Sequence, residues 1–141
     1  MHVKYNSLAV QLKHVTIVIY VTGVYGCNSR IRENTTFALY NFPSKYTSPI
    51  DCVYSLIGPM IGYKVKVTFL YLDIQDGDCS TDRIEVYDGK KLAPQNKMAE
   101  ICNGSSGERE FTSSGRHMRI RYIGNTLNTY QGFHASVKFL S

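Results

Sequence analysis

Four cysteines are the residues whose spacing carries the most chemical information in this sequence. Cys27, Cys52, Cys79 and Cys102 follow one another at intervals of 25, 27 and 23 residues. Structural zinc sites usually bring their ligands as close Cys-x-x-Cys pairs, and no such pair occurs here. An even number of cysteines in a small chain favours a disulfide framework instead. Four cysteines allow three pairings; the sequential one closes two loops of about 25 residues, each stabilising by roughly 3 kcal/mol.

Side chains that could catalyse a reaction are few. Beyond residue 26 the only histidines are His117 and His134, and both fall on the more polar side of an alternating stretch, where exposure is the default. The sequence contains no Gly-x-Ser-x-Gly, His-Glu-x-x-His or glycine-rich phosphate-binding motif. If all four cysteines are paired, no thiol nucleophile remains. We therefore predict that the protein is not an enzyme.

Basic side chains offer a second kind of chemistry, the binding of acidic groups. The formal net charge is +5, and residues 27–141 hold 14 basic against 11 acidic side chains, a difference of +3. On neighbouring strands, two groups of cations would form a surface for an acidic or sulfated glycan. These cations are Lys64, Lys66, Arg116, Arg119 and Arg121. The alternative is a solvated face balanced by glutamates, and no nucleic-acid partner is expected because aromatic residues are not interleaved with the cations.

Two acceptor sequons for N-linked glycans are present. Asn34 and Asn103 each begin an Asn-x-Ser/Thr motif, and both lie in intervals that we expect to be loops. The second sits in a Gly-Ser turn that should be exposed. We expect at least one of the two to carry a glycan.

The first 26 residues have the outline of a secretory signal peptide. They contain no acid, include Lys4 and Lys13, and continue into an apolar run over residues 15–24. Small residues allow cleavage after Gly23 or after Gly26, and we favour the second. The run is far shorter than the ~20 residues that cross a bilayer, so no permanent membrane span is expected. The alternative is a structured N-terminal strand, because Val, Ile and Tyr are strand formers.

The rest of the chain has the pattern of an all-β fold. Apolar and polar side chains alternate in several stretches between turn-rich intervals, and no segment carries a 3.6-residue apolar stripe. The clearest alternation covers residues 64–69, 83–87, 117–122 and 133–139. This spacing suits a sandwich of two sheets. The sequence predicts a single domain over residues 27–141.

The order of the motifs in this domain resembles that of the CUB domain. The similar segments are residues 40–46, 52–56, 67–74, 79–89, 101–102, 118–122 and 132–133. The most specific reads Cys-Ser-Thr-Asp-Arg-Ile-Glu-Val-Tyr-Asp-Gly over residues 79–89. The resemblance implies secretion and a jelly-roll sandwich of two antiparallel sheets with two disulfides, Cys27 to Cys52 and Cys79 to Cys102. In length the chain is similar to the spermadhesins, small secreted proteins that each consist of one CUB domain.

The resemblance also points to calcium, which many CUB domains bind at one end of the sandwich. There the ion helps to present acidic side chains to a basic residue of a partner protein. The corresponding residues here are Tyr46, Gln75, Asp82, Asn125 and Asn128, and Asp73 is a nearby acid that could join them. Gln75 and Asn125 stand where the family has Glu and Asp, and calcium affinity follows the number of charged ligands. The site should therefore be severely weakened unless aspartates in residues 73–78 compensate; the alternative is that these are solvated acids of a turn.

Together these features predict a non-enzymatic extracellular binding module. The resemblance implies that such a module recognises another extracellular protein through the loops at one end of the sandwich. The alternative function is binding of a glycan such as heparin through the basic strand face, as the similarity to spermadhesins implies. Calcium is the one cofactor that the resemblance suggests.

Overall fold

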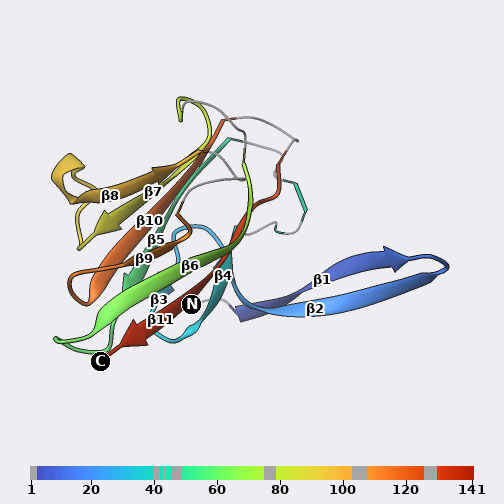
Figure 1. Cartoon of the computed structure of the whole chain (residues 1–141), viewed down its shortest axis with the longest axis horizontal. Helices are drawn as coiled ribbons and strands as arrows, with labels where there is room; N and C mark the ends of the chain where they lie inside the picture. Colours follow the sequence, from blue (N-terminus) through green and yellow to red (C-terminus); the bar gives the residue numbers. More distant parts are fainter. Residues whose placement is uncertain are drawn as a thin grey trace.

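Two β-sheets pack face to face in this protein (Figure 1). The computed structural model describes residues 3–39, 42, 44–45, 49–74, 79–102, 108–125 and 130–141. The six-stranded sheet, here named the β11 sheet, has the order β1 (Val3–Leu12), β2 (Val15–Tyr25), β4 (Thr35–Ala38), β11 (Gly132–Leu140), β6 (Lys64–Asp73), β9 (Glu110–Thr112). The five-stranded sheet, here named the β10 sheet, has the order β3 (Arg30–Ile31), β5 (Ile50–Ile57), β10 (His117–Gly124), β7 (Arg83–Asp88), β8 (Lys97–Ile101). A 3₁₀ turn, η1 (Pro94–Asn96), leads into β8.

The central strands of both sheets pair in antiparallel fashion with their neighbours. β10 lies between β5 and β7, and β11 lies between β4 and β6. Two short parallel pairings occur as well, between β2 and β4 and between β3 and β5. The four stretches with the clearest alternation coincide with β6, β7, β10 and β11, so the predicted all-β sandwich is confirmed.

The core between the sheets is built around Phe133 on β11. Its ring lies 5.4 Å from that of Tyr54, 5.6 Å from Phe37, 5.7 Å from Tyr122 and 6.0 Å from Phe69, measured between centroids. Tyr54 and Tyr122 come from the β10 sheet, so these rings join the two layers. Tilted and edge-on pairs of this kind each contribute about 1 kcal/mol beyond the area they bury. The aromatic content of the sequence is therefore concentrated where the sheets meet.

Gly132 precedes this central ring and has a backbone that favours glycine. Its φ is +91°, in the left-handed region that side chains disfavour. A Cβ atom there would lie 2.9 Å from the Cδ2 atom of Leu39. The Gly-Phe pair therefore lets β11 begin against Leu39 with Phe133 turned into the core.

Both disulfides connect sequential cysteines. Cys27 is bonded to Cys52 on β5, and Cys79 is bonded to Cys102 at the end of β8, with Cα atoms 5.0 and 4.9 Å apart. No cysteine is free. The pairing is the one that the CUB resemblance implies.

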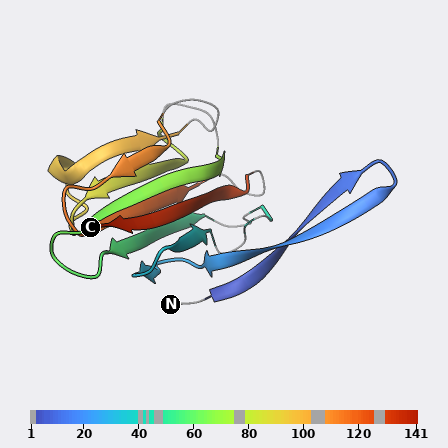
Figure 2. The ribbon, with the colours of Figure 1, turned by 60° about the horizontal axis from the view of Figure 1, so that its bottom comes forward.

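Residues 3–25 form a hairpin that extends away from the sandwich (Figures 1 and 2). β1 and β2 pair antiparallel from Val3 opposite Val24 to Leu12 opposite Val15. Only the last two residues of β2 join the sandwich, because Val24 and Tyr25 pair with β4. Among the described residues there is no helix both long and apolar enough to cross a membrane. Removal of residues 1–26 during secretion stays a prediction.

Candidate binding surfaces

One end of the sandwich carries the positions that the CUB resemblance assigns to calcium. β6 ends at Asp73, β7 begins directly after Asp82, and β10 is followed by Asn125, so these residues share one end of the molecule. We call it the loop end. Tyr46, Gln75 and Asn128 belong to the same predicted set and lie outside the described residues.

The carboxylates at the loop end hold the backbone of neighbouring segments. Asp82 is 1 % exposed, and its Oδ1 atom accepts the N–H of Asn125 at 2.9 Å. The side-chain amide of Asn125 donates in turn to the carbonyl of Thr81. Asp73 acts similarly, since its Oδ2 atom accepts the N–H of Gln131 at 2.9 Å. These bonds tie the segment before β7 to the end of β10, and the end of β6 to the start of β11.

The described members of this set, Asp73, Asp82 and Asn125, do not by themselves supply the ligands of a calcium ion. Calcium takes six to eight oxygen ligands, several of them from carboxylates. Within the described ranges, no group of three or more His, Cys, Asp or Glu side chains is placed to hold a metal. The structure therefore gives Asp73 and Asp82 a role in connecting strands.

The outer face of the β10 sheet has two halves with different electrostatics, and the first is centred on Arg121. Its Nε and Nη2 atoms donate to the two carboxylate oxygens of Asp51 at 2.9 and 2.8 Å. Arg121 lies opposite Glu85 on β7, and its Nη1 atom is 3.7 Å from Glu85 Oε1. Hydrogen bonding from Arg121 lowers the pKa of Asp51 below its ordinary value.

Glu85 is the buried centre of this half, with 3 % of its surface exposed. Its carboxylate accepts from Arg83 Nε at 2.8 Å, from the Tyr87 hydroxyl at 2.8 Å and from Lys97 Nζ at 3.3 Å. Burial acts to raise the pKa of Glu85, but the hydrogen bonds from Arg83, Tyr87 and Lys97 outweigh it, so the pKa is lowered. We call Asp51, Arg83, Glu85, Lys97 and Arg121 the paired half.

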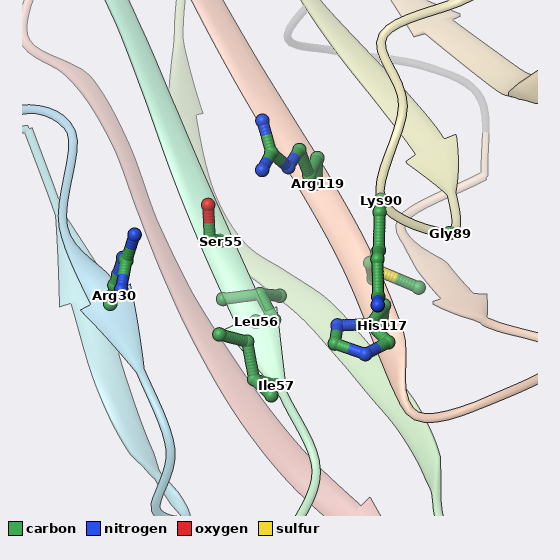
Figure 3. A pocket seen from close by; sticks show the side chains of 9 residues that line it. Arg30, Ser55, Leu56, Ile57, Gly89, Lys90, His117 and Arg119 are labelled. Carbon is green, nitrogen blue, oxygen red and sulfur yellow. The ribbon is translucent and has the colours of Figure 1, made fainter.

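The second half contains a pocket with a volume of about 170 Å³ (Figure 3). The strand register sets its shape, because Ser55 on β5 lies opposite both Arg30 on β3 and Arg119 on β10. The lining residues are Arg30, Ser55, Leu56, Ile57, Gly89, Lys90, His117, Met118 and Arg119. Figure 3 shows Arg30 and Arg119 on the two sides of Ser55, and Lys90 beside His117. We call this the cationic pocket.

The cationic pocket contains positive charge without a matching carboxylate. Arg30, Lys90 and Arg119 form no ion pair with any described residue, and none of the lining residues is acidic. The pKa of His117 is lowered, first by burial and then by cations that include Lys90 and Arg119. The arrangement is suited to binding an anion.

A glycine turn places Lys90 at the pocket. Gly89 follows β7 with φ +101°, and its N–H donates to the carbonyl of His117 at 3.0 Å. Only glycine adopts this φ without strain. The turn after β7 is thereby tied to the start of β10, with Lys90 next to His117.

The structure separates the five cations that the sequence grouped together. Lys64 and Lys66 lie on β6 in the β11 sheet, whereas Arg119 and Arg121 lie on β10 in the other sheet, so they do not share one face. Lys66 pairs with Glu110 at 3.3 Å. Arg30 and Lys90 were not predicted. Arg30 belongs to a two-residue strand and Lys90 to a turn, so neither has an alternation pattern that would have signalled a shared surface.

The first sequon lies on an exposed turn. Asn34 precedes β4, and its Oδ1 atom accepts the N–H of Phe139 at 2.9 Å. The amide nitrogen is the atom that would carry a glycan. Asn103 lies outside the described residues, and glycosylation at both positions stays a prediction.

Comparison with known proteins identifies the family. A family model of the CUB domain matches residues 27–137, and the chain therefore belongs to the CUB domain family. Cubilin of Rattus norvegicus is 32 % identical over 97 residues, 67 % of this chain and 2 % of cubilin. Tolloid-like protein 1 of Mus musculus is 28 % identical over 98 residues, 68 % of this chain and 9 % of that protein. The chain spans only a small part of either relative.

Solved structures show the same fold. The full extracellular region of zebrafish Gpr126/Adgrg6 matches 82 % of this chain and 15 % of its own, with a TM-score of 0.70 and 23 % identity. The MASP-1 CUB2 domain bound to Ca²⁺ matches 79 % of this chain and 96 % of its own, with a TM-score of 0.65 and 19 % identity. At these identities the likeness concerns the fold alone.

Proposed function

We propose that the protein is a non-enzymatic extracellular module that recognises another extracellular protein through its loop end. The observation that carries this proposal is the bond between the buried carboxylate of Asp82 and the N–H of Asn125, which ties two segments of the loop end together. The disulfide between Cys79 and Cys102 also lies at the loop end, where it connects the segment before β7 to the end of β8. Loops held by a rigid scaffold lose little conformational entropy on binding.

The proposed setting is the extracellular space, with an N-terminal signal peptide that ends at Gly23 or at Gly26. Two disulfides support an oxidising compartment. The packing of the segment favours cleavage after Gly23 over cleavage after Gly26. Val24 is fully buried, and the carbonyl of Gly26 accepts the hydroxyl of Tyr54 at 2.5 Å. Sequencing the N-terminus of the secreted protein distinguishes the two sites; a chain that begins at Cys27 would contradict this choice.

The recognition experiment compares two exposed positions at opposite ends of the sandwich. Thr81 lies at the loop end, whereas Ile61, which is 88 % exposed, lies in the turn between β5 and β6. Wild type, Thr81→Arg and Ile61→Arg are screened against an array of recombinant extracellular domains. We expect Thr81→Arg to abolish a specific interaction that Ile61→Arg retains. The opposite result, or equal loss in both variants, would overturn recognition through the loop end.

The proposal does not require calcium. A ligand that binds the folded state raises its unfolding temperature. We expect the wild type to unfold at the same temperature in millimolar calcium and in EDTA, because its described carboxylates at the loop end bond backbone N–H groups. A clear increase in calcium would show that other oxygens complete a site and that the ion organises recognition.

Glycan binding is the second candidate function, and the cationic pocket is the observation that favours it. The predicted surface of Lys64, Lys66 and Arg121 is not the support, because two of these residues lie on the other sheet and Arg121 is paired with Asp51. The pocket holds Arg119 of the predicted set together with cations that the sequence did not indicate.

A further inference from the structure

We propose that the cationic pocket binds a sulfate ester of an extracellular glycan, and that an adjoining pocket receives the sugar ring that carries it. The inference rests on the second candidate function, for which it names the ligand chemistry, and it uses residues other than those of the loop end. It places a second binding site on the outer face of the β10 sheet, at the opposite end of β7 and β10 from Asp82 and Asn125.

The lining of the cationic pocket indicates an anion with several oxygens. Arg30 and Arg119 flank Ser55, so two guanidinium groups and a hydroxyl lie around one space of about 170 Å³ (Figure 3). Planar guanidinium groups donate two parallel hydrogen bonds to oxyanions, and such charge-assisted bonds are the stronger ones. Lys90 adds a third cation at the side formed by the turn after β7. A compact group with several acceptor oxygens fits this donor set.

The adjoining pocket has a different chemistry. Its volume is about 370 Å³, and it shares Gly89 and His117 with the cationic pocket. Its other lining residues are Asp88, Gln95, Asn96, Ser114, Gly115 and Arg116. The acid among them is already engaged, since Asp88 Oδ1 accepts the N–H of Ser114 at 3.0 Å. Amide and hydroxyl side chains both donate and accept hydrogen bonds, which is what the hydroxyls of a sugar ring require.

The absence of an aromatic anchor at the pocket favours a glycan over an acidic peptide. Protein-binding surfaces usually depend on a few exposed aromatic or apolar side chains. The cationic pocket has no Phe, Tyr or Trp in its lining; Leu56 and Met118 are fully buried, and Ile57 is partly exposed. Two more cations, Arg32 and Arg116, lie near the pocket, since both are close enough to His117 to lower its pKa. Spaced cations suit a chain of repeating anionic groups.

The principal experiment measures binding of a heparin-derived octasaccharide by calorimetry. Arg30→Gln/Arg119→Gln removes two cations from the pocket, and Lys64→Gln/Lys138→Gln removes two exposed cations from the β11 sheet. We expect the pocket variant to weaken binding by about tenfold or more, because hydrogen bonds to charged groups are lost. The matched variant should change affinity by about twofold or less. Equal weakening, or no binding by the wild type, would overturn the proposal.

Two competitors identify the chemistry that is recognised. A hyaluronan octasaccharide carries carboxylates without sulfate, and polyglutamate is an acidic peptide. We expect neither to displace the heparin octasaccharide at equal charge concentration. Displacement by polyglutamate would replace the glycan with an acidic protein segment, and displacement by hyaluronan would remove the requirement for sulfate.

A measurement on the wild type keeps the test independent of how the variants fold. The imidazole of His117 lies in both pockets, so its NMR titration reports a bound anion. Saturating octasaccharide should raise the pKa of His117 because an anion stabilises the protonated ring. An unchanged pKa would contradict binding at this place. Thr81→Arg should bind the octasaccharide like the wild type, so failure of this site and failure of loop-end recognition are distinguishable.

Discussion

Two arginines of the same strand show how differently equal charges are used in this fold. Arg119 and Arg121 are two residues apart on β10, and alternate residues of a strand lie on the same face. Arg121 bonds both oxygens of Asp51 and lies near Glu85. Arg119 has Ser55 and Tyr87 as its cross-strand neighbours and forms no ion pair with any described residue.

The comparison teaches that the partners of a charge, rather than the number of charges, separate a structural surface from a binding surface. The paired half satisfies its cations with Asp51 and Glu85, so it has little attraction left for a ligand. In the cationic pocket, Arg30, Lys90 and Arg119 have no ion-pair partner among the described residues. An acidic ligand therefore gains most at the pocket.

Removing the buried carboxylate should have the largest effect on stability. Glu85→Gln removes the buried negative charge that Arg83, Lys97 and Arg121 share, and we expect a loss of about 2–3 kcal/mol in the free energy of unfolding. Urea unfolding at neutral pH measures it. The control is Glu100→Gln, which removes a surface pair to Lys97 and should change stability by less than about 1 kcal/mol. Similar losses of stability in both variants would mean that the buried ion pairs of Glu85 stabilise the fold no more than the surface pair of Glu100.

Acid should remove the advantage of the paired half. The pKa of Glu85 is lower in the folded chain than its ordinary value of 4.5, so its contribution is complete above about pH 4.5. It is lost as the pH falls through the lower folded value, because the unfolded chain then binds the proton more readily. The pKa of Asp51 is likewise lower than its ordinary value of 3.8, so its contribution to stability is also lost as the pH falls below about 3.8. The difference in unfolding free energy between the wild type and Glu85→Gln should therefore stay constant from neutral pH down to about pH 4.5 and narrow in more acid solution. A difference that stays constant in acid would contradict the lowered pKa.

Substitution of the two arginines should give a smaller difference in stability. Arg121→Gln removes a two-pronged pair in which Asp51 is largely exposed, and we expect a loss of about 1 kcal/mol. Arg119→Gln removes no ion pair with a described residue and should stay within about 0.5 kcal/mol of the wild type. Thermal unfolding of the two variants side by side provides the measurement. If Arg119→Gln were the more damaging change, the division of this face into two halves would be wrong.

Much of the fold could be predicted from the sequence, because strands with one buried face leave a period of two in the chain. The alternation in β6, β7, β10 and β11 indicated the sandwich, and the motif around Cys79 indicated the family. Which strands share a sheet leaves no such local pattern, and for that reason the cations of β6 and β10 were grouped although they lie on different sheets.

The candidate site was harder to predict because its contacts join distant segments. Glu85 sits at an outward position of β7 and is nonetheless buried, since Lys97 from β8 and Arg121 from β10 close over it. His134 was expected to be exposed but is half-buried, because Phe42 stacks on its ring with centroids 5.4 Å apart. Long-range packing of this kind has no signature in a short stretch of sequence.

The smallest expected effect is a change in one histidine, and it tests the electrostatics of the cationic pocket directly. After burial, the charges of Lys90, Arg116, Arg119 and Arg32 lower the pKa of His117. Arg119→Gln should raise that pKa by a fraction of a unit, because one of the four repelling charges is removed. NMR titration of the imidazole in the variant and the wild type measures the shift.

The matched change for this titration is Arg121→Gln. Arg121 carries the same charge on the same strand, but Asp51 and Glu85 neutralise it, and it is not among the cations that act on His117. We expect the pKa of His117 to be unchanged in Arg121→Gln. If both variants raised it equally, the charge of Arg121 would reach the pocket despite its carboxylates, and pairing would not be what separates the two halves. A shift in Arg119→Gln alone would mean that the cationic pocket carries a positive potential of its own, which is the property that binding of a sulfate ester requires.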